Sequence, residues 1–218
     1  METNQTEEQQ IEAVKQWWKE NGSSIITGLL LGIALLFGAR SWFAYQERTA
    51  ENASNVYINM MSALREDNEA LVNQQAAVLI ADYSSTPYAT LAALALAKIR
   101  LEQGEPEAAR TQLQWALDNS GADMLREVVR LRLVRVLIAA GDLDGAEALL
   151  GQAPPDTAFG PLHNELRGDI YAARGAAERA RDEYEQALVL MQATTPERNI
   201  LQLKYENTHP GATSGESP

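Results

Sequence analysis

The stretch that decides the fold runs from Gly104 to Ala116 and reads Gly-Glu-Pro-Glu-Ala-Ala-Arg-Thr-Gln-Leu-Gln-Trp-Ala. Alanine follows the glycine at five and at twelve positions, and leucine follows it at nine. Glycine permits the positive φ of a tight turn between two helices. The two alanines share one helix face, where a neighbouring helix can come close, and the leucine fills the groove between them. The stretch therefore predicts a helix–turn–helix unit.

The same spacing recurs twice more along the chain. The turn glycines are Gly104, Gly141 and Gly175, which are 37 and 34 residues apart. The positions five, nine and twelve residues after them hold Ala109, Leu113 and Ala116, then Ala146, Leu150 and Ala153, then Ala180, Tyr184 and Ala187. Apolar helices are expected before the glycines, at Leu91–Leu101, Val128–Ile138 and Leu162–Ala173. This period resembles that of a tetratricopeptide repeat.

The resemblance is weaker in the first helix of each unit. Arg130 and Asn164 stand where a tetratricopeptide repeat often has an aromatic residue. Only Gly168 supplies a glycine seven positions before a turn glycine, and Ala97 and Val134 stand at the other two places. We therefore expect an α-solenoid of degenerate repeats rather than a generic helical bundle.

Further helices are expected on both sides of these units. Ala50–Glu66 and Glu69–Tyr83 predict a helix pair without the turn glycine, as is common for a terminal repeat. Pro196–Asn207 predicts a closing helix whose apolar residues face inward, namely Ile200, Leu201 and Leu203. From Thr208 onward no apolar periodicity remains, which predicts a disordered tail.

An uncharged run from Asn21 to Ala39 precedes the repeats. As a helix it would extend about 28 Å, close to the thickness of the hydrocarbon core of a bilayer. Aromatic residues that suit the headgroup region flank it, namely Trp17, Trp18, Trp42, Phe43 and Tyr45. The acidic first twenty residues and the lack of an Ala-x-Ala site disfavour a cleaved signal peptide. The run predicts an uncleaved transmembrane anchor rather than a buried core helix.

The surroundings of the anchor leave its orientation and its neighbours open. Two lysines before it are balanced by two arginines after it, so the positive-inside rule does not decide the orientation: Lys15, Lys19, Arg40 and Arg48. The residues before the anchor could form a helix on the membrane surface, or the first turns of the span with a break near Gly22. Small residues spaced by four are candidates for packing on a second span, although glycine is frequent in spans anyway: Ser24, Gly28 and Gly32.

The composition argues against several classes of function. The formal net charge is −12, so the chain should repel nucleic acid. Cysteine is absent, which removes disulfides, thiol nucleophiles and zinc–cysteine sites. His163 and His209 are far apart in the sequence, and Asp142–Gly145 suits helix capping better than calcium binding. Because no phosphate loop or nucleophile arrangement is visible either, we expect no enzyme, no metal and no cofactor.

A binding surface remains. In stacked helix pairs the first helices line the concave side. This places three cations near that side, among the apolar residues Leu94, Leu101, Leu131 and Ile138: Lys98, Arg132 and Arg135. Cations among apolar groups could hold an acidic segment or one that ends in a carboxylate. The alternative is that the two arginines pair with acidic neighbours on adjacent helices.

Several longer segments carry a family resemblance through their order and spacing. They are residues 10–22 (Gln-Ile-Glu-Ala-Val-Lys-Gln-Trp-Trp-Lys-Glu-Asn-Gly), residues 88–97 before the first clear repeat, residues 109–117 after its turn, residues 129–136, and residues 166–168. With the glycine-spaced span, this order resembles the ancillary SecYEG translocon subunit family of Gram-negative bacteria, over about residues 8–205. The tail after Thr208 is not part of the resemblance.

The resemblance implies an all-α protein of the bacterial inner membrane that crosses it once. Its N-terminus would lie in the cytoplasm and its repeat domain in the periplasm, which is a type II topology. The implied partners are the SecYEG translocon, a membrane-anchored periplasmic prolyl-isomerase-like chaperone and newly translocated client proteins, which the chain would pass to periplasmic chaperones. No catalytic residue is implied.

The expected domains follow the same order. They are an N-terminal cytoplasmic tail at 1–20, partly an amphipathic helix, the anchor and its interfacial flank at 21–45, the tetratricopeptide-like domain at 46–207 and the disordered tail at 208–218. Two other functions remain open. One is a membrane-tethered signalling or assembly adaptor with the repeat domain in the cytoplasm, which the balanced flanking charges allow. The other is an enzyme whose site is assembled across the helices.

Overall fold

The computed structural model describes residues 3–151, 158–191 and 195–208, which form nine helices and no strands. The helices are α1 (Thr3–Arg65), α2 (Glu69–Asp82), α3 (Pro87–Glu102), α4 (Pro106–Asn119), α5 (Asp123–Ala139), α6 (Leu143–Leu150), α7 (Gly160–Ala173), α8 (Ala177–Leu190) and α9 (Glu197–Asn207). The predicted all-α fold is confirmed. By its internal contacts the chain divides into two compact units, Met1–Asn52 and Ala53–Pro218.

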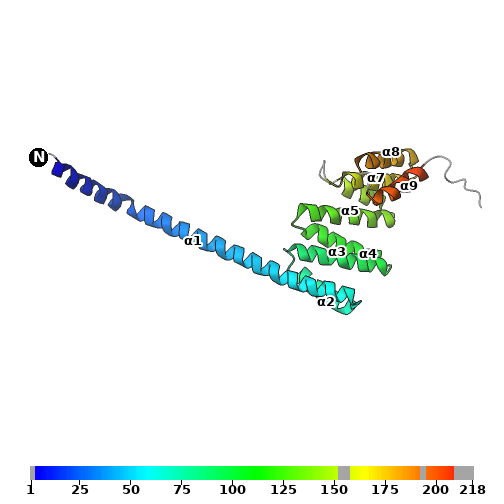
Figure 1. Cartoon of the computed structure of the whole chain (residues 1–218), viewed down its shortest axis with the longest axis horizontal. Helices are drawn as coiled ribbons and strands as arrows, with labels where there is room; N and C mark the ends of the chain where they lie inside the picture. Colours follow the sequence, from blue (N-terminus) through cyan, green and yellow to red (C-terminus); the bar gives the residue numbers. More distant parts are fainter. Residues whose placement is uncertain (1–2, 152–157, 192–194, 209–218) are drawn as a thin grey trace, which may run out of the picture. The chain divides into compact units, whose positions relative to one another are not determined.

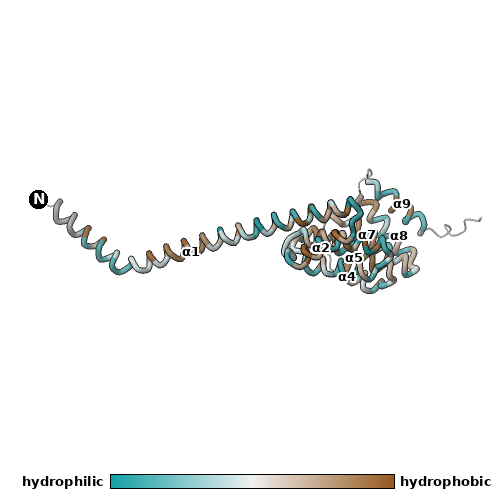
Figure 2. Tube along the Cα trace, turned by 90° about the horizontal axis from the view of Figure 1, so that it is seen from below, coloured by the Kyte–Doolittle hydropathy of each residue, from teal (hydrophilic) through white to brown (hydrophobic). Residues whose placement is uncertain are grey.

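The first unit consists of the N-terminal part of α1. Among the described residues, α1 holds the one stretch long and apolar enough to cross a membrane, and only 6% of that stretch is buried. Figure 2 shows brown and pale residues along the middle of α1, with teal residues before and after them. The helix runs without a break through Gly22, where an added Cβ would lie 3.2 Å from Cε2 of Trp18. The helix is thus continuous here, but Figure 2 shows α1 bending between the teal residues before the apolar stretch and that stretch, so both alternatives for the residues before the anchor remain open.

The turn glycines of the second unit have the predicted geometry. Gly104, Gly141 and Gly175 have φ values of 77°, 80° and 75°. At each turn the amide after the glycine donates to a carbonyl five residues earlier, for example Glu105 N to Arg100 O at 2.8 Å. This is the Schellman arrangement that ends a helix. The spacing signature was therefore a correct prediction of where each first helix stops.

The residues after the turns pack as the sequence predicts. The alanines at the two repeat positions are all 0% exposed where the structure describes them, namely Ala109, Ala116, Ala146, Ala180 and Ala187. The larger residues between them are 2–3% exposed, namely Leu113, Leu150 and Tyr184. Ala153 lies outside the described residues. Close approach of the paired helices therefore depends on these small side chains.

The first helix pair has the same turn without glycine. Asp67 has a φ of 53°, and the amide of Asn68 donates to Ala63 O at 2.9 Å. Asp67 precedes Gly104 by 37 residues, so it occupies the equivalent repeat position. Aspartate is among the residues that tolerate the left-handed conformation. The predicted pair Ala50–Glu66 and Glu69–Tyr83 is thus the end of α1 followed by α2, joined by a repeat turn that the glycine pattern cannot reveal.

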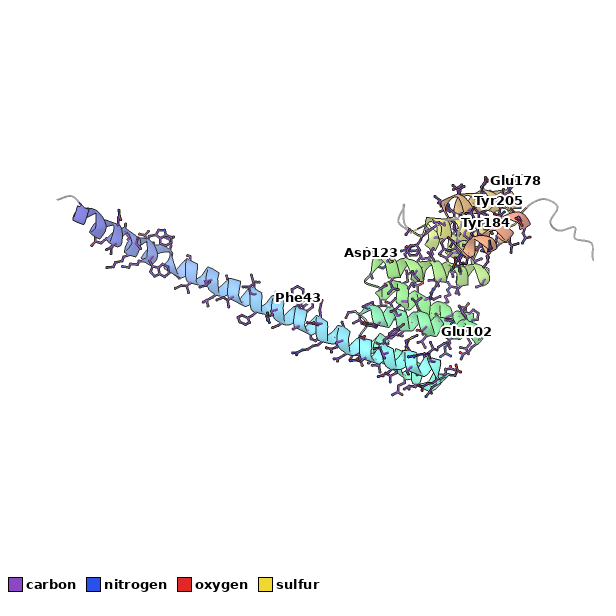
Figure 3. All side chains as sticks on the ribbon, in the orientation of Figure 1. Phe43, Glu102, Asp123, Glu178, Tyr184 and Tyr205 are labelled. Atoms are coloured by element: carbon purple, nitrogen blue, oxygen red, sulfur yellow. The ribbon has the colours of Figure 1, made fainter. Side chains whose placement is uncertain are left out.

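The first helices of successive repeats stack on one another. Helix α3 contacts α5, and α5 contacts α7, while α4, α6 and α8 pack against them as second helices. Figure 1 shows α3, α5 and α7 following one another through the stack. Glu102, at the end of α3, and Asp123, at the start of α5, lie on opposite sides of the stack (Figure 3). The two helices therefore run in the same direction. The groove between them is therefore bounded by two parallel first helices.

One expectation for α9 is wrong. Leu201 is fully buried, but Ile200 and Leu203 are each 60% exposed. Successive residues of a helix are rotated by about 100°, so three residues at such spacing cannot all face one core. The predicted tail begins at Thr208, whose amide donates to Tyr205 O at 3.2 Å as the C-cap of α9, and residues 209–218 lie outside the described residues.

Candidate functional site

The three predicted binding cations line one groove between α3 and α5. Its volume is about 550 Å³ and its wall is mainly apolar. The lining residues are Leu94, Ala97, Lys98, Leu101, Pro106, Leu113, Arg132, Arg135, Val136, Ala139 and Ala140. Leu94 and Leu101 take part as predicted, whereas Leu131 and Ile138 do not line it. The structure therefore brings Lys98 from one repeat together with Arg132 and Arg135 from the next.

Helix α5 presents its two arginines because its other faces are buried. The apolar residues around them are at most 6% exposed, namely Leu131, Leu133, Val134, Val136 and Leu137. Arg132 and Arg135 are three residues apart, so they lie on the same side of the helix, and both are exposed. The two guanidinium groups are therefore presented together at the edge of the apolar groove.

The arginines of this groove have no partners among the residues that the structure describes. Neither Arg132 nor Arg135 forms an ion pair or a hydrogen bond there, so the alternative of pairing with acidic neighbours is not found. Lys98 Nζ lies 3.6 Å from Glu102 Oε1, but both side chains are more than half exposed. Such an exposed pair contributes little stability. All three cations therefore remain available to a ligand.

A second cavity adjoins the groove and was not predicted from the sequence. Its volume is about 640 Å³. Its apolar wall comes from α7, from the end of α8 and from α9, and includes Phe159, Pro161, Leu162, Leu190 and Ile200. Arg135, Glu165 and Glu197 supply charged groups. The available signal was the pair of apolar residues on α9 that a single core cannot accommodate.

A buried polar cluster joins α5 to α7. Arg130 Nη1 donates to Glu127 Oε2, and His163 Nε2 lies 2.8 Å from Glu127 Oε1. Glu127 is 4% exposed and His163 is 8% exposed. Arg130, whose side chain is 12% exposed, therefore stands in place of the aromatic residue of the repeat pattern, and Glu127 balances its charge. This cluster explains where His163 lies, and its contacts are with Glu127 rather than with other metal-ligating side chains.

A second polar network closes the last repeat. Lys204 Nζ donates to Glu165 Oε1 at 2.7 Å and to Asp169 Oδ2 at 2.8 Å, and Tyr184 donates to Asp169 Oδ1 at 2.8 Å. Burial alone would lower the pKa of Lys204, but the hydrogen bonds to Asp169 and Glu165 outweigh it and raise that pKa. Burial, together with the nearby Asp169 charge, raises the pKa of Tyr184. These contacts attach both α9 and α8 to α7.

Two further predicted features can be located. Among the residues that the structure describes, no group of three or more His, Asp or Glu side chains could hold a metal ion, and His209 lies outside them. In the anchor, Ser24 is exposed, and a Cβ added at Gly28 or Gly32 would meet no atom within 4 Å. The face that carries these small residues is thus open for a neighbouring helix.

Comparisons with known proteins cover nearly the whole chain. Residues 15–209 match the family model of the tetratricopeptide repeat-like domain. A curated relative from Haemophilus influenzae, named ancillary SecYEG translocon subunit, is 35% identical over 181 residues, or 83% of this chain and 88% of the relative. A relative of the same name from Escherichia coli K12 is 31% identical over 207 residues, or 95% and 98% of the two chains. No solved structure matches the chain.

Proposed function

Because this chain belongs to the ancillary SecYEG translocon subunit family, we propose that it is a membrane-anchored interaction scaffold of the Sec translocon. The observation that carries the proposal is the match to relatives of that name over nearly their whole length. A single candidate span in α1 and a domain of stacked helical repeats suit such a role. Repeat surfaces of this kind bind other proteins, and a non-catalytic adaptor fits both the repeat fold and the names of the relatives.

The finer role that we propose is the transfer of newly translocated proteins to periplasmic chaperones. Its partners would be the SecYEG channel, a membrane-anchored prolyl-isomerase-like chaperone and the translocated clients. This requires a type II topology in the inner membrane, with residues 1–20 in the cytoplasm, an anchor and flank at 21–45 and the repeat domain at 46–207 in the periplasm. The acidic domain supports a position away from anionic lipid headgroups.

Two sets of residues are proposed to make the contacts. Lys98, Arg132 and Arg135 would bind a partner in the groove between α3 and α5, because their charges face an apolar wall and the arginines lack partners within the described residues. Ser24, Gly28 and Gly32 would pack on a membrane helix of another subunit, since small residues let two spans approach closely. The first set would bind the chaperone and the clients, and the second would bind the channel.

Affinity capture of the full chain from membranes in mild detergent tests the scaffold role. SecY, SecE and SecG should be recovered with the intact protein, and recovery of none of them would contradict the proposal. Arg132→Ala combined with Arg135→Ala should lose the chaperone but keep the channel. The control with the same charge change is Arg110→Ala with Arg174→Ala, whose guanidinium groups already pair with carboxylates. It should keep both partners.

The adaptor with a cytoplasmic repeat domain remains a second candidate, because the charges flanking the anchor are balanced. Protease added to spheroplasts separates the two topologies. Degradation of the repeat domain in intact spheroplasts supports the periplasmic placement. Full protection, with degradation only after the membrane is permeabilised, would instead favour the cytoplasmic adaptor.

A further inference from the structure

The two cavities of the repeat domain meet at one side chain. Arg135 lines both the groove of about 550 Å³ between α3 and α5 and the cavity of about 640 Å³ beside α7 and α9. Both volumes are in the range of sites that hold several side chains of a ligand. An exposed guanidinium with an apolar cavity on each side is thus the central element of a longer surface.

The second cavity adds mainly apolar surface and one exposed carboxylate. Leu190 is 59% exposed and Ile200 is 60% exposed, so both present much of their side chains to solvent. Glu165 also lines this cavity, but Lys204 Nζ lies 2.7 Å from its Oε1 and balances its charge. Glu197 is the exposed carboxylate on this side. Apolar contact is therefore what this half offers a ligand.

We propose that the two cavities form one bipartite groove that binds a single apolar polypeptide segment by a carboxylate in its middle. The Asp or Glu of the segment meets Arg135, with Arg132 and Lys98 beside it, and the apolar side chains before and after this residue enter the two cavities. The proposal rests on the proposed function, because it names the chemistry of the client segment that the scaffold holds. It adds the cavity beside α7 and α9 to the predicted site.

The position of the charge selects this occupant. A fatty acid or phospholipid carries its charge at one end of its chains, whereas Arg135 stands between two apolar cavities. A polypeptide can place a carboxylate in the middle of an apolar sequence, and an arginine binds it with two parallel hydrogen bonds. The net charge of −12 disfavours a polyanion such as nucleic acid. An apolar segment with one acidic residue satisfies each of these conditions.

Fluorescence anisotropy with the full chain in nanodiscs tests this arrangement. The probe is a labelled synthetic peptide of Leu and Phe residues around a central Asp, and its variants carry Asn or Lys at that position. Arg135→Ala should weaken binding of the Asp peptide about tenfold, the effect of losing about 1.4 kcal/mol. Arg135→Glu should prefer the Lys peptide to the Asp peptide. A reversal of this kind cannot result from loss of folding.

Helix α9 offers a matched pair for the apolar half. Ile200 and Leu203 are both 60% exposed, but only Ile200 lines the second cavity. Ile200→Ser should weaken the Asp peptide about fivefold, the effect of losing about 1 kcal/mol of apolar contact, while Leu203→Ser should bind as the unaltered chain does. Equal effects of the two serine variants, or no effect of Arg135→Ala, would overturn the bipartite groove. Binding to phosphatidylglycerol vesicles without binding of any peptide would overturn it as well.

The same variants distinguish failure of this proposal from failure of the scaffold role. If the channel subunits are captured but the peptide results contradict the bipartite groove, the proposed function stands and the inference fails. If the peptides bind as expected but no channel subunit is captured, the groove stands and the scaffold role fails.

Discussion

The charges around α9 and those in the groove between α3 and α5 are used in opposite ways. Lys204 is 31% exposed and contacts Glu165 and Asp169, whose side chains are 12% and 20% exposed. Arg132 and Arg135 are exposed, and within the described residues they contact no carboxylate. A partly buried charge without a partner destabilises a fold, whereas an exposed one costs little. This difference supports the proposed division, in which paired cations stabilise the domain and the cations of the groove bind a partner, and substitutions can test that division.

The largest effect is expected for Lys204→Met. The substitution leaves Glu165 and Asp169 facing each other without a cation, so we expect the free energy of unfolding to fall by about 3 kcal/mol, the lower end for breaking a buried ion pair. Urea denaturation of the full chain in detergent measures it. Lys98→Met is the matched control, because the exposed pair with Glu102 should contribute no more than about 0.5 kcal/mol. Equal losses of unfolding free energy in Lys204→Met and Lys98→Met would contradict the division between paired cations and exposed cations.

Gly168→Ala tests the apolar contact beside the same network. A Cβ at this position would lie 2.4 Å from Cε1 of Tyr184, so the tyrosine ring or one of the two helices must shift. Overpacking of this kind costs about 3 kcal/mol, and alanine recovers about 1 kcal/mol by its higher helix propensity, which leaves a net loss of about 2 kcal/mol. The control is Gly160→Ala, where the nearest atom would be Cδ1 of Leu190 at 3.7 Å. The free energy of unfolding of the Gly160→Ala variant should not fall.

Tyr184→Phe should reduce stability by about 1 kcal/mol near neutral pH, because the hydrogen bond to Asp169 is lost. The pKa of Tyr184 is raised in the folded chain, as is that of Lys204. In both cases the unfolded chain loses its proton first, so stability is retained below about pH 10 and falls as the pH rises further. Urea midpoints across this range should show a shallower alkaline fall for the phenylalanine variant. An unchanged slope would mean that Tyr184 titrates normally.

The smallest effect is expected for Arg132→Ala combined with Arg135→Ala. These side chains are exposed and form no ion pair within the described residues, so the free energy of unfolding should change by less than about 0.5 kcal/mol. The removal of two like charges three residues apart can even stabilise α5 slightly. Urea denaturation checks this alongside the capture experiment. A loss as large as that of Lys204→Met would assign these arginines to stability instead of binding.

Local steric requirements made most of the fold predictable. The glycine at each turn and the alanines after it are demanded by backbone conformation and by helix approach, and both leave a spacing in the sequence. The grouping of Lys98 with Arg132 and Arg135 followed from the same repeat geometry. The family resemblance was likewise confirmed by relatives that cover most of the chain.

The features that could not be predicted from the sequence depend on contacts between distant segments. The position of His163 beside Glu127 is set by how α7 packs on α5, and no pattern along the chain encodes it. The second cavity is likewise assembled from α5, α7, α8 and α9. The turn between Glu66 and Glu69 was predicted, but its left-handed residue Asp67 was not, because aspartate adopts that conformation without the glycine signature. The predicted orientation of α9 was wrong because a short helix with three apolar residues can bury different ones of them.

At the repeat turns, the handedness of the α-carbon decides which residues can occupy the position. At Gly104, Gly141 and Gly175 a Cβ would meet no atom within 4 Å, so space does not exclude a side chain there. What excludes it is chirality, since L-residues rarely adopt φ values near 75–80° whereas D-residues favour them. A D-alanine would therefore adopt the backbone conformation of all three positions without strain. Asp67 shows the converse, an L-residue held in a mirror-image conformation by the same ring of hydrogen bonds.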